Sequence, residues 1–196
     1  MASTKEDTAL TLLLTPDNPS NTSISDAGNG ALFYRVDTEF KSPTSSTAVT
    51  TVSSAVGKTI ASWKWRENWP NKLTLRNAAP MLMSRWLKKS IIPLDDTATF
   101  SDPTNGKQFQ WKGHMLYSKD DKAHPIAAFC PTQRIPHSRL TPEEIETGPH
   151  YIPARLIILD ARGEEALDFV VVSLLVLERQ RRTIGVVWPG SSFAHR

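Results

Sequence analysis

Basic side chains are the residues of this sequence best suited to chemistry with a partner. Lys and Arg on neighbouring strands can bind a phosphorylated head group, because several donors and positive charges then converge on one anion. Two groups have suitable spacing, one alternating along an extended segment and one clustered a little further on. We take them as candidate residues for an anionic ligand: Lys64, Arg66, Arg85, Lys88 and Lys89.

The alternative is a solvated basic rim that binds nothing. Three further arginines, Arg179, Arg181 and Arg182, follow an apolar run and would complement a helix dipole there. Trp65 or Trp69 could insert at a membrane interface beside the first basic group. The net charge of +3 and the pI of about 9.1 permit an anionic partner. That charge is too small, without a recognised motif, to favour nucleic acid.

Motifs for catalysis, metal binding or cofactor binding are missing from the sequence. The histidines lack metal-ligand spacing, and the sequence has no nucleophile elbow, phosphate loop or dinucleotide fingerprint. Cys130 could act as a nucleophile with a histidine, although a strand cysteine is usually part of a core. Asp95-Asp96 and Asp120-Asp121 lack the additional oxygen ligands of a calcium loop. We predict no catalytic residue, no cofactor and no metal site.

The segment Ala166–Leu177 is the only long apolar run, and the fold must bury it. Acidic Glu164 and Glu165 precede it and basic residues follow it, which suits a helix over 164–182. Its valines would also suit a strand, but length and flanking charges favour a helix. At about a dozen residues, the run is shorter than the 18 or so needed to cross a membrane. The predicted core residues of this helix are Leu167, Phe169, Val170, Val171, Leu174, Leu175 and Leu177.

Many short strand patterns, recurring roughly every ten residues, precede the helix and predict a mostly β fold. One example is the hairpin signature Phe100–Lys112, which carries Asn105-Gly106 between its two arms. A closed antiparallel β-barrel around the apolar helix would bury the whole helix and leave no strand edge exposed. We expect one domain over 9–182, a disordered N-terminus over 1–8 and a C-terminal tail over 183–196.

The order of these segments resembles the tubby C-terminal-like superfamily, which includes tubby proteins, phospholipid scramblases and LURP-one-related plant proteins. More closely, the sequence resembles an uncharacterised fungal domain-of-unknown-function family expected to share that fold. The resemblance implies a barrel of about twelve strands with a central C-terminal helix. Tubby proteins bind phosphoinositides and scramblases act at membranes. The matching stretches are Leu10–Leu14, Leu32–Val36, Ile60–Trp65, Thr99–Phe100, Phe109–Lys112 and Leu167–Arg182.

Three functional hypotheses follow. The first is a non-enzymatic tubby-like module that binds an anionic lipid head group or a protein partner. The second is an enzyme or small-ligand-binding protein whose site assembles only in three dimensions, and the third is a structural or stress-associated interaction protein. A single cysteine and no visible signal peptide favour the cytoplasm, with a possible peripheral location at membranes. The oligomeric state and the role of the 183–196 tail stay open.

Overall fold

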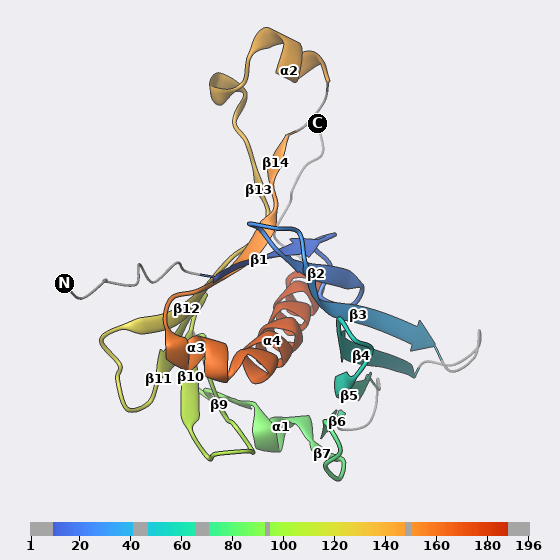
Figure 1. Ribbon diagram of the computed structural model, residues 1–196, viewed down its shortest axis with the longest axis vertical. Helices are drawn as coiled ribbons and strands as arrows, with labels where there is room; N and C mark the ends of the chain where they lie inside the picture. The colour runs from blue at the N-terminus through green and yellow to red at the C-terminus, as the bar shows by residue number, and fades with distance from the viewer. Residues whose placement is uncertain (1–9, 41–46, 66–70, 93–94, 148–149, 188–196) are drawn as a thin grey trace, which may run out of the picture.

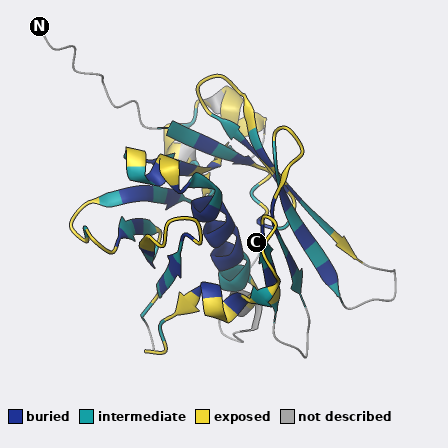
Figure 2. Cartoon of the chain, turned by 60° about the horizontal axis from the view of Figure 1, so that its bottom comes forward, coloured by how far each residue is buried: buried dark blue, intermediate teal, exposed yellow. Residues whose placement is uncertain are grey.

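The apolar run forms helix α4 (Leu167–Val187), which lies in the middle of the molecule (Figure 1). The computed structural model describes residues 10–40, 47–65, 71–92, 95–147 and 150–187. Every residue from Phe169 to Glu178 is buried, so this stretch of the helix is enclosed on all its sides (Figure 2). No helix of the described chain is both long enough and apolar enough to cross a membrane.

A large antiparallel sheet surrounds α4. Its order is β7-β6-β5-β4-β3-β2-β1-β15-β12-β11-β10-β9-β8, so consecutive strands pair in two runs that meet where β1 pairs with β15. The strands are β1 (Leu10–Thr15), β2 (Thr22–Asp26), β3 (Leu32–Phe40), β4 (Ala48–Ser54), β5 (Thr59–Trp65), β6 (Lys72–Leu75), β7 (Met81–Leu82), β8 (Lys88–Lys89), β9 (Thr97–Ser101), β10 (Gln108–Lys112), β11 (Met115–Ser118), β12 (Pro125–Cys130) and β15 (Ala154–Ile158).

The prediction of a closed antiparallel barrel is wrong. The sheet has 13 strands and ends at β7 on one side and at β8 on the other, without pairing between them. The short helix α1 (Met83–Trp86) joins these two strands and occupies the space where a closing ladder would run. Its backbone bonds internally, with Leu87 N donating to Met83 O at 2.9 Å. We refer to this opening between β7 and β8 as the seam.

Apolar side chains from α1 explain why the seam needs no strand pairing to cover the core. Met83, Trp86 and Leu87 are buried, and Trp86 Nε1 donates to the carbonyl oxygen of Ser101 at 2.9 Å. The Trp86 ring lies 5.4 Å from that of Phe100, between centroids. One helical turn and the residue that follows it therefore shield α4 with three large side chains where the sheet stops.

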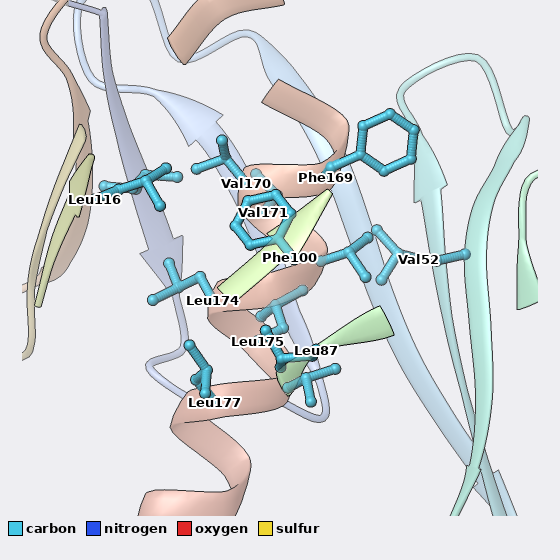
Figure 3. Close-up of a cluster of buried hydrophobic side chains, with 14 of the residues drawn as sticks. Val52, Leu87, Phe100, Leu116, Phe169, Val170, Val171, Leu174, Leu175 and Leu177 are labelled. Atoms are coloured by element: carbon cyan, nitrogen blue, oxygen red, sulfur yellow. The ribbon is translucent and has the colours of Figure 1, made fainter. Parts of the chain in front are cut away.

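The inner faces of the strands supply the rest of the core by simple alternation. In β10 the side chains of Phe109 and Trp111 are buried while Gln108 and Lys112 are exposed, as the hairpin signature predicts. Side chains from facing strands, such as Val52 and Leu116, meet the helix from different directions (Figure 3). The only polar helix residue within the buried run before Glu178 is Ser173, whose Oγ accepts from Trp111 Nε1 at 2.9 Å and donates to Val170 O.

The remaining elements are short. The helix α3 (Ala161–Glu165) precedes α4 and is N-capped by Asp160. An arm of β13 (Gln133–Arg134), a 3-10 turn (His137–Arg139), α2 (Pro142–Glu146) and β14 (Tyr151–Ile152) extends away from the sheet (Figure 1). Helix α4 starts after the predicted position 164 and continues to Val187, into the segment expected to be a tail. The predicted disordered segment 1–8 lies outside the described residues.

Candidate functional site

An open groove of about 580 Å³ lies at the seam. Its walls come from α1, from β8 and from the loop after β8, and α4 contributes one polar side chain. That side chain, Gln180, donates to Met83 Sδ at 3.9 Å. The lining residues are Asn71, Met83, Ser84, Leu87, Lys88, Lys89, Ser90, Ile91 and Gln180. The groove thus combines apolar walls with hydroxyl, amide and ammonium donors, a composition suited to a polar anionic group carrying an apolar part.

Two of the predicted basic residues, Lys88 and Lys89 of β8, line this groove. Arg85 of α1 follows the lining residue Ser84 in the chain, and all three basic residues are exposed. Partial burial lowers the pKa of Lys89, and the Arg181 charge lowers it further while Asp96 opposes the shift. A bound anion would stabilise the charged ammonium that this environment disfavours.

The other two predicted basic residues differ in position. Lys64 lies on β5, directly opposite Lys72 of β6, and Lys72 in turn lies opposite Leu82 of β7. Lys64 and Lys72 therefore form a row that leads across the outer face of the sheet to the seam. Like charges directly opposite one another destabilise a sheet unless an anion lies between them. Arg66 lies outside the described residues.

Two large apolar side chains are exposed next to these charges. Ile91 is 97% exposed and Ile92 is 64% exposed, immediately after β8. At these exposures, packing among the residues that the structure describes does not account for the two isoleucines. Such a combination of apolar tips and basic neighbours is typical of surfaces that meet a membrane interface.

Beside the seam, the last turns of α4 carry an ionic network. Glu178 is buried, and its carboxylate contacts Arg181 at 2.7 Å, Arg182 at 3.5 Å and His114 at 3.7 Å. Arg181 also contacts the Asp96 carboxylate at 2.8 Å and the carbonyl oxygen of Gly113 at 2.7 Å. The helix end is thereby tied to the strands around it, and these arginines have carboxylate partners within the protein.

Arg182 extends the network to the β1–β2 connection. It donates to the Asp17 carbonyl at 2.7 Å and to the Asp17 carboxylate at 2.6 Å. Burial raises the pKa of Asp17, but hydrogen bonds from Arg182 and Thr132 outweigh burial, so the net shift is downward from its ordinary value of 3.8. The ionised carboxylate is therefore the form that the fold stabilises.

We expect Asp17→Asn to lower the free energy of unfolding by about 1 kcal/mol at neutral pH. A lowered folded-state pKa stabilises the fold fully above the unfolded value and loses that contribution as pH falls through the folded value. The difference between wild type and variant should therefore begin to shrink as the pH falls below 3.8, and it should vanish only below the lower folded-state pKa. Urea unfolding at a series of pH values measures it. Asp37→Asn, which removes a partner of exposed Arg35, is the control, and an equal effect there would contradict the assignment.

Arg179 takes a different role from its neighbours. Its guanidinium carbon lies 4.3 Å from the centroid of the Trp65 ring, and Nη1 donates to Ser20 Oγ. Trp65 Nε1 donates to Thr50 Oγ1 at 3.0 Å. Trp65 is therefore held against α4 and the sheet, which disfavours its predicted insertion into a membrane. Trp69 lies outside the described residues.

At the other end of α4, Asp168 joins the helix to the sheet. It accepts from Tyr34 Oη at 2.7 Å and pairs with Arg76 at 2.8 Å. Arg76 has a φ of +48°, in the left-handed region that non-glycine residues rarely adopt. Its guanidinium carbon also lies 5.1 Å from the ring centroid of Phe169, so both of these side-chain contacts of Arg76 are with the start of α4.

The acidic pairs considered as cation ligands are engaged elsewhere. Asp96 pairs with Arg181, and Asp121 pairs with Arg162 at 3.2 Å and with His124 at 3.2 Å. Within the described ranges, no three His, Cys, Asp or Glu side chains are placed to hold a metal ion. Cys130 is half-buried on β12.

Sequence reasoning missed the lysine opposite Lys64 and the two exposed isoleucines. In the sequence, a single residue, Ser90, separates the basic pair Lys88-Lys89 from the apolar pair Ile91-Ile92, and Pro93 follows. The neighbouring charged and apolar pairs are therefore visible in the sequence. The composition of Ser84–Ile92 also suits a strand, and a strand would place one isoleucine of the pair on the buried face. In the structure this segment contains part of α1, the two residues of β8 and an exposed loop.

Comparisons with known proteins give a family and one solved structure. Residues 17–183 match a family of unknown function, DUF6593. Among solved structures, the chain is similar to a protein from Arabidopsis thaliana at 10% identity, over 88% of this chain and 91% of that chain, with a TM-score of 0.44. No curated protein matches the sequence. Since the family match spans most of the chain, this protein belongs to the DUF6593 family, whose function is unknown.

Proposed function

We propose that this protein is a non-enzymatic module that binds an anionic membrane surface through the seam. In this proposal a phosphate-bearing lipid head group enters the groove, and Ile91 and Ile92 enter the membrane interface. The observation that carries the proposal is the position of these two exposed isoleucines in the loop that follows Lys88 and Lys89 of β8, where Ile91 lines the groove. A purely solvated basic rim would not need exposed isoleucines.

Charge supports this orientation. A basic residue near an anionic bilayer contributes about 1 kcal/mol of attraction. The row that includes Lys64 and Lys72 continues toward the seam, where Arg85, Lys88 and Lys89 are exposed. An anionic surface would reduce the repulsion between the two opposed lysines. These charges therefore favour a surface with many phosphates over a single isolated anion.

The polar lining of the groove supports binding of one head group within that surface. Lys88 and Lys89 supply ammonium donors, and Ser84 and Ser90 supply hydroxyls. A phosphate oxygen accepts several charge-assisted hydrogen bonds at once, which compensates for leaving water. Because burial lowers the pKa of Lys89, a bound phosphate would also favour the charged ammonium form that burial disfavours.

The apolar residues supply the second part of the binding energy. Removing an isoleucine side chain fully from water contributes roughly 1.5–3 kcal/mol, and an interfacial position recovers part of it. Two isoleucines and several basic residues together meet the requirement of two signals for stable membrane attachment. The proposal also includes kinship with the tubby-like superfamily, on the stretches quoted above, and a cytoplasmic protein that attaches peripherally to membranes.

We expect Lys88→Gln with Lys89→Gln to weaken binding to anionic vesicles by about 30-fold, which corresponds to two basic residues at about 1 kcal/mol each.

Ile91→Ser with Ile92→Ser should weaken binding without changing its salt dependence. Co-sedimentation with phosphatidylcholine vesicles, with and without phosphatidylinositol phosphates, measures both effects. Binding of the wild type should also fall between low and physiological ionic strength, about 0.15 M.

Lys58→Gln with Lys122→Gln is the matched control, because it removes the same charge from exposed positions away from the seam. Equal weakening by this control would mean that only net charge matters. Absence of wild-type binding to phosphoinositide vesicles at low salt would contradict the lipid proposal itself.

A further inference from the structure

A second groove, of about 780 Å³, lies at the opposite end of α4 from the seam. Leu167 of α4 lines this groove and Gln180 lines the seam groove, 13 positions later and so about 20 Å further along the helix axis. Its apolar part comes from Leu10 of β1, Phe33 of β3 and Leu167. All three are half-buried and pack against the core, so the groove is a partly uncovered flank of the hydrophobic interior.

Two carboxylates border this apolar surface, Asp26 at the end of β2 and Glu164 in α3. Asp26 Oδ1 accepts from Gly28 N at 2.8 Å, which fixes the side chain beside the groove. Neither carboxylate forms an ion pair with any residue that the structure describes. By contrast, the nearby acids have basic partners, since Glu165 pairs with Lys107 at 2.6 Å and Asp168 pairs with Arg76 at 2.8 Å.

We propose that this groove docks a basic and apolar peptide segment of a protein partner. Large apolar side chains of such a segment would cover Leu10, Phe33 and Leu167, and its Lys or Arg side chains would pair with Asp26 and Glu164. The same two carboxylates repel anionic head groups, so the groove is unsuited to the lipid proposed for the seam. Two carboxylates above an apolar floor also supply too few oxygen ligands for calcium.

The proposal does not depend on membrane binding at the seam. If both sites operate, the opposite positions of the two grooves along α4 allow one molecule to contact a membrane and a partner at the same time. At the seam, basic residues would attract an anionic surface, and at the second groove, carboxylates would attract a basic segment. Failure of either proposal would therefore be observed separately, in vesicle binding or in peptide binding.

The test uses a labelled hexapeptide of alternating lysine and leucine, and a matched hexapeptide of alternating glutamate and leucine. We expect the full chain to bind the basic peptide by fluorescence anisotropy and to bind the acidic peptide at least tenfold more weakly. Asp26→Asn with Glu164→Gln should weaken basic-peptide binding roughly tenfold, as expected for two partly exposed ion pairs. The asparagine keeps an oxygen to accept from Gly28 N, so the turn stays intact.

Glu143→Gln with Glu146→Gln on exposed α2 removes the same charge far from the groove and should leave binding unchanged. Phe33→Ser is a second variant, expected to weaken binding while the urea midpoint identifies any loss of fold. Equal loss in the α2 control, equal binding of both peptides, or no binding at all would overturn the proposal. So would a dimer of the free protein that the Asp26 and Glu164 variants dissociate, since the groove would then hold a second copy.

Discussion

Val171→Asp and Leu174→Asp are each expected to prevent the chain from folding. Val171 is 0% exposed and Leu174 is 1% exposed, and both lie in the part of α4 that is enclosed on every side. Folding would move the aspartate carboxyl group out of water into a site that offers no hydrogen-bond partner. This transfer costs several kcal/mol in either protonation state. That cost, together with the lost apolar burial, is comparable with the 5–15 kcal/mol by which domains of this kind are stable.

Val56→Asp is the matched control, because Val56 is 88% exposed in the turn between β4 and β5. We expect this variant to fold like the wild type. Far-ultraviolet circular dichroism, gel filtration and urea unfolding distinguish the variants. Soluble Val171→Asp protein with a cooperative unfolding transition would contradict the position of α4 in the core.

The second large effect concerns Glu178, the buried carboxylate at the end of α4. Glu178→Gln removes the charge that compensates Arg181, whose side chain is only 19% exposed, and Arg182 beside it. Asp96 and Asp17 remain as carboxylate partners of Arg181 and Arg182, but both are more exposed than Glu178. Losing the buried carboxylate of such a network costs up to about 3 kcal/mol. We expect a loss of that size in the free energy of unfolding from urea denaturation.

Glu165→Gln provides the same chemical change in an exposed setting. Glu165 pairs with Lys107, and the two side chains are 59% and 46% exposed. Exposed pairs contribute less than about 1 kcal/mol, so this variant should be nearly neutral. Similar losses at both positions would show that burial of Glu178 has no special energetic consequence.

The central helix is the part of the fold that could be predicted most directly. The segment 166–177 is apolar at nearly every position, and only a site enclosed on all sides can bury such a helix. The strand patterns were likewise readable, because Phe109 and Trp111 alternate with polar residues as a half-buried strand requires. Local composition and periodicity determine both features, and both are visible in one sequence.

Closure of the sheet could not be predicted in the same way. Whether β7 and β8 pair depends on the conformation of the five residues between Leu82 and Lys88, which could form a strand or a helical turn. Met83, Trp86 and Leu87 suit an inward-facing helical turn that covers α4, and this arrangement leaves the two strands apart. The competition is between two local conformations with similar hydrophobic burial, so composition alone did not discriminate between them.

The candidate site was predicted in part. Arg85, Lys88 and Lys89 lie close together in sequence. In the structure Lys88 and Lys89 line one groove, and Arg85 follows the lining residue Ser84 on α1. The relation between Lys64 and Lys72 depends on strand register, and the groove itself depends on the open seam. Neither could be read from spacing. The second groove combines β1, β2, β3 and α3, whose side chains meet only in three dimensions.

The most direct test of the proposed membrane site is an environment-sensitive fluorophore at Ile91. In a Cys130→Ser background, Ile91→Cys and Val56→Cys each present one exposed thiol for labelling. Val56 is the control because it lies away from the seam: its neighbour Ala55 donates from N to the carbonyl oxygen of Phe33, which lines the second groove. With vesicles containing phosphatidylinositol phosphates, we expect a blue shift of the label at position 91 and none at position 56. An unchanged spectrum at position 91, or equal shifts at both positions, would contradict binding through the seam.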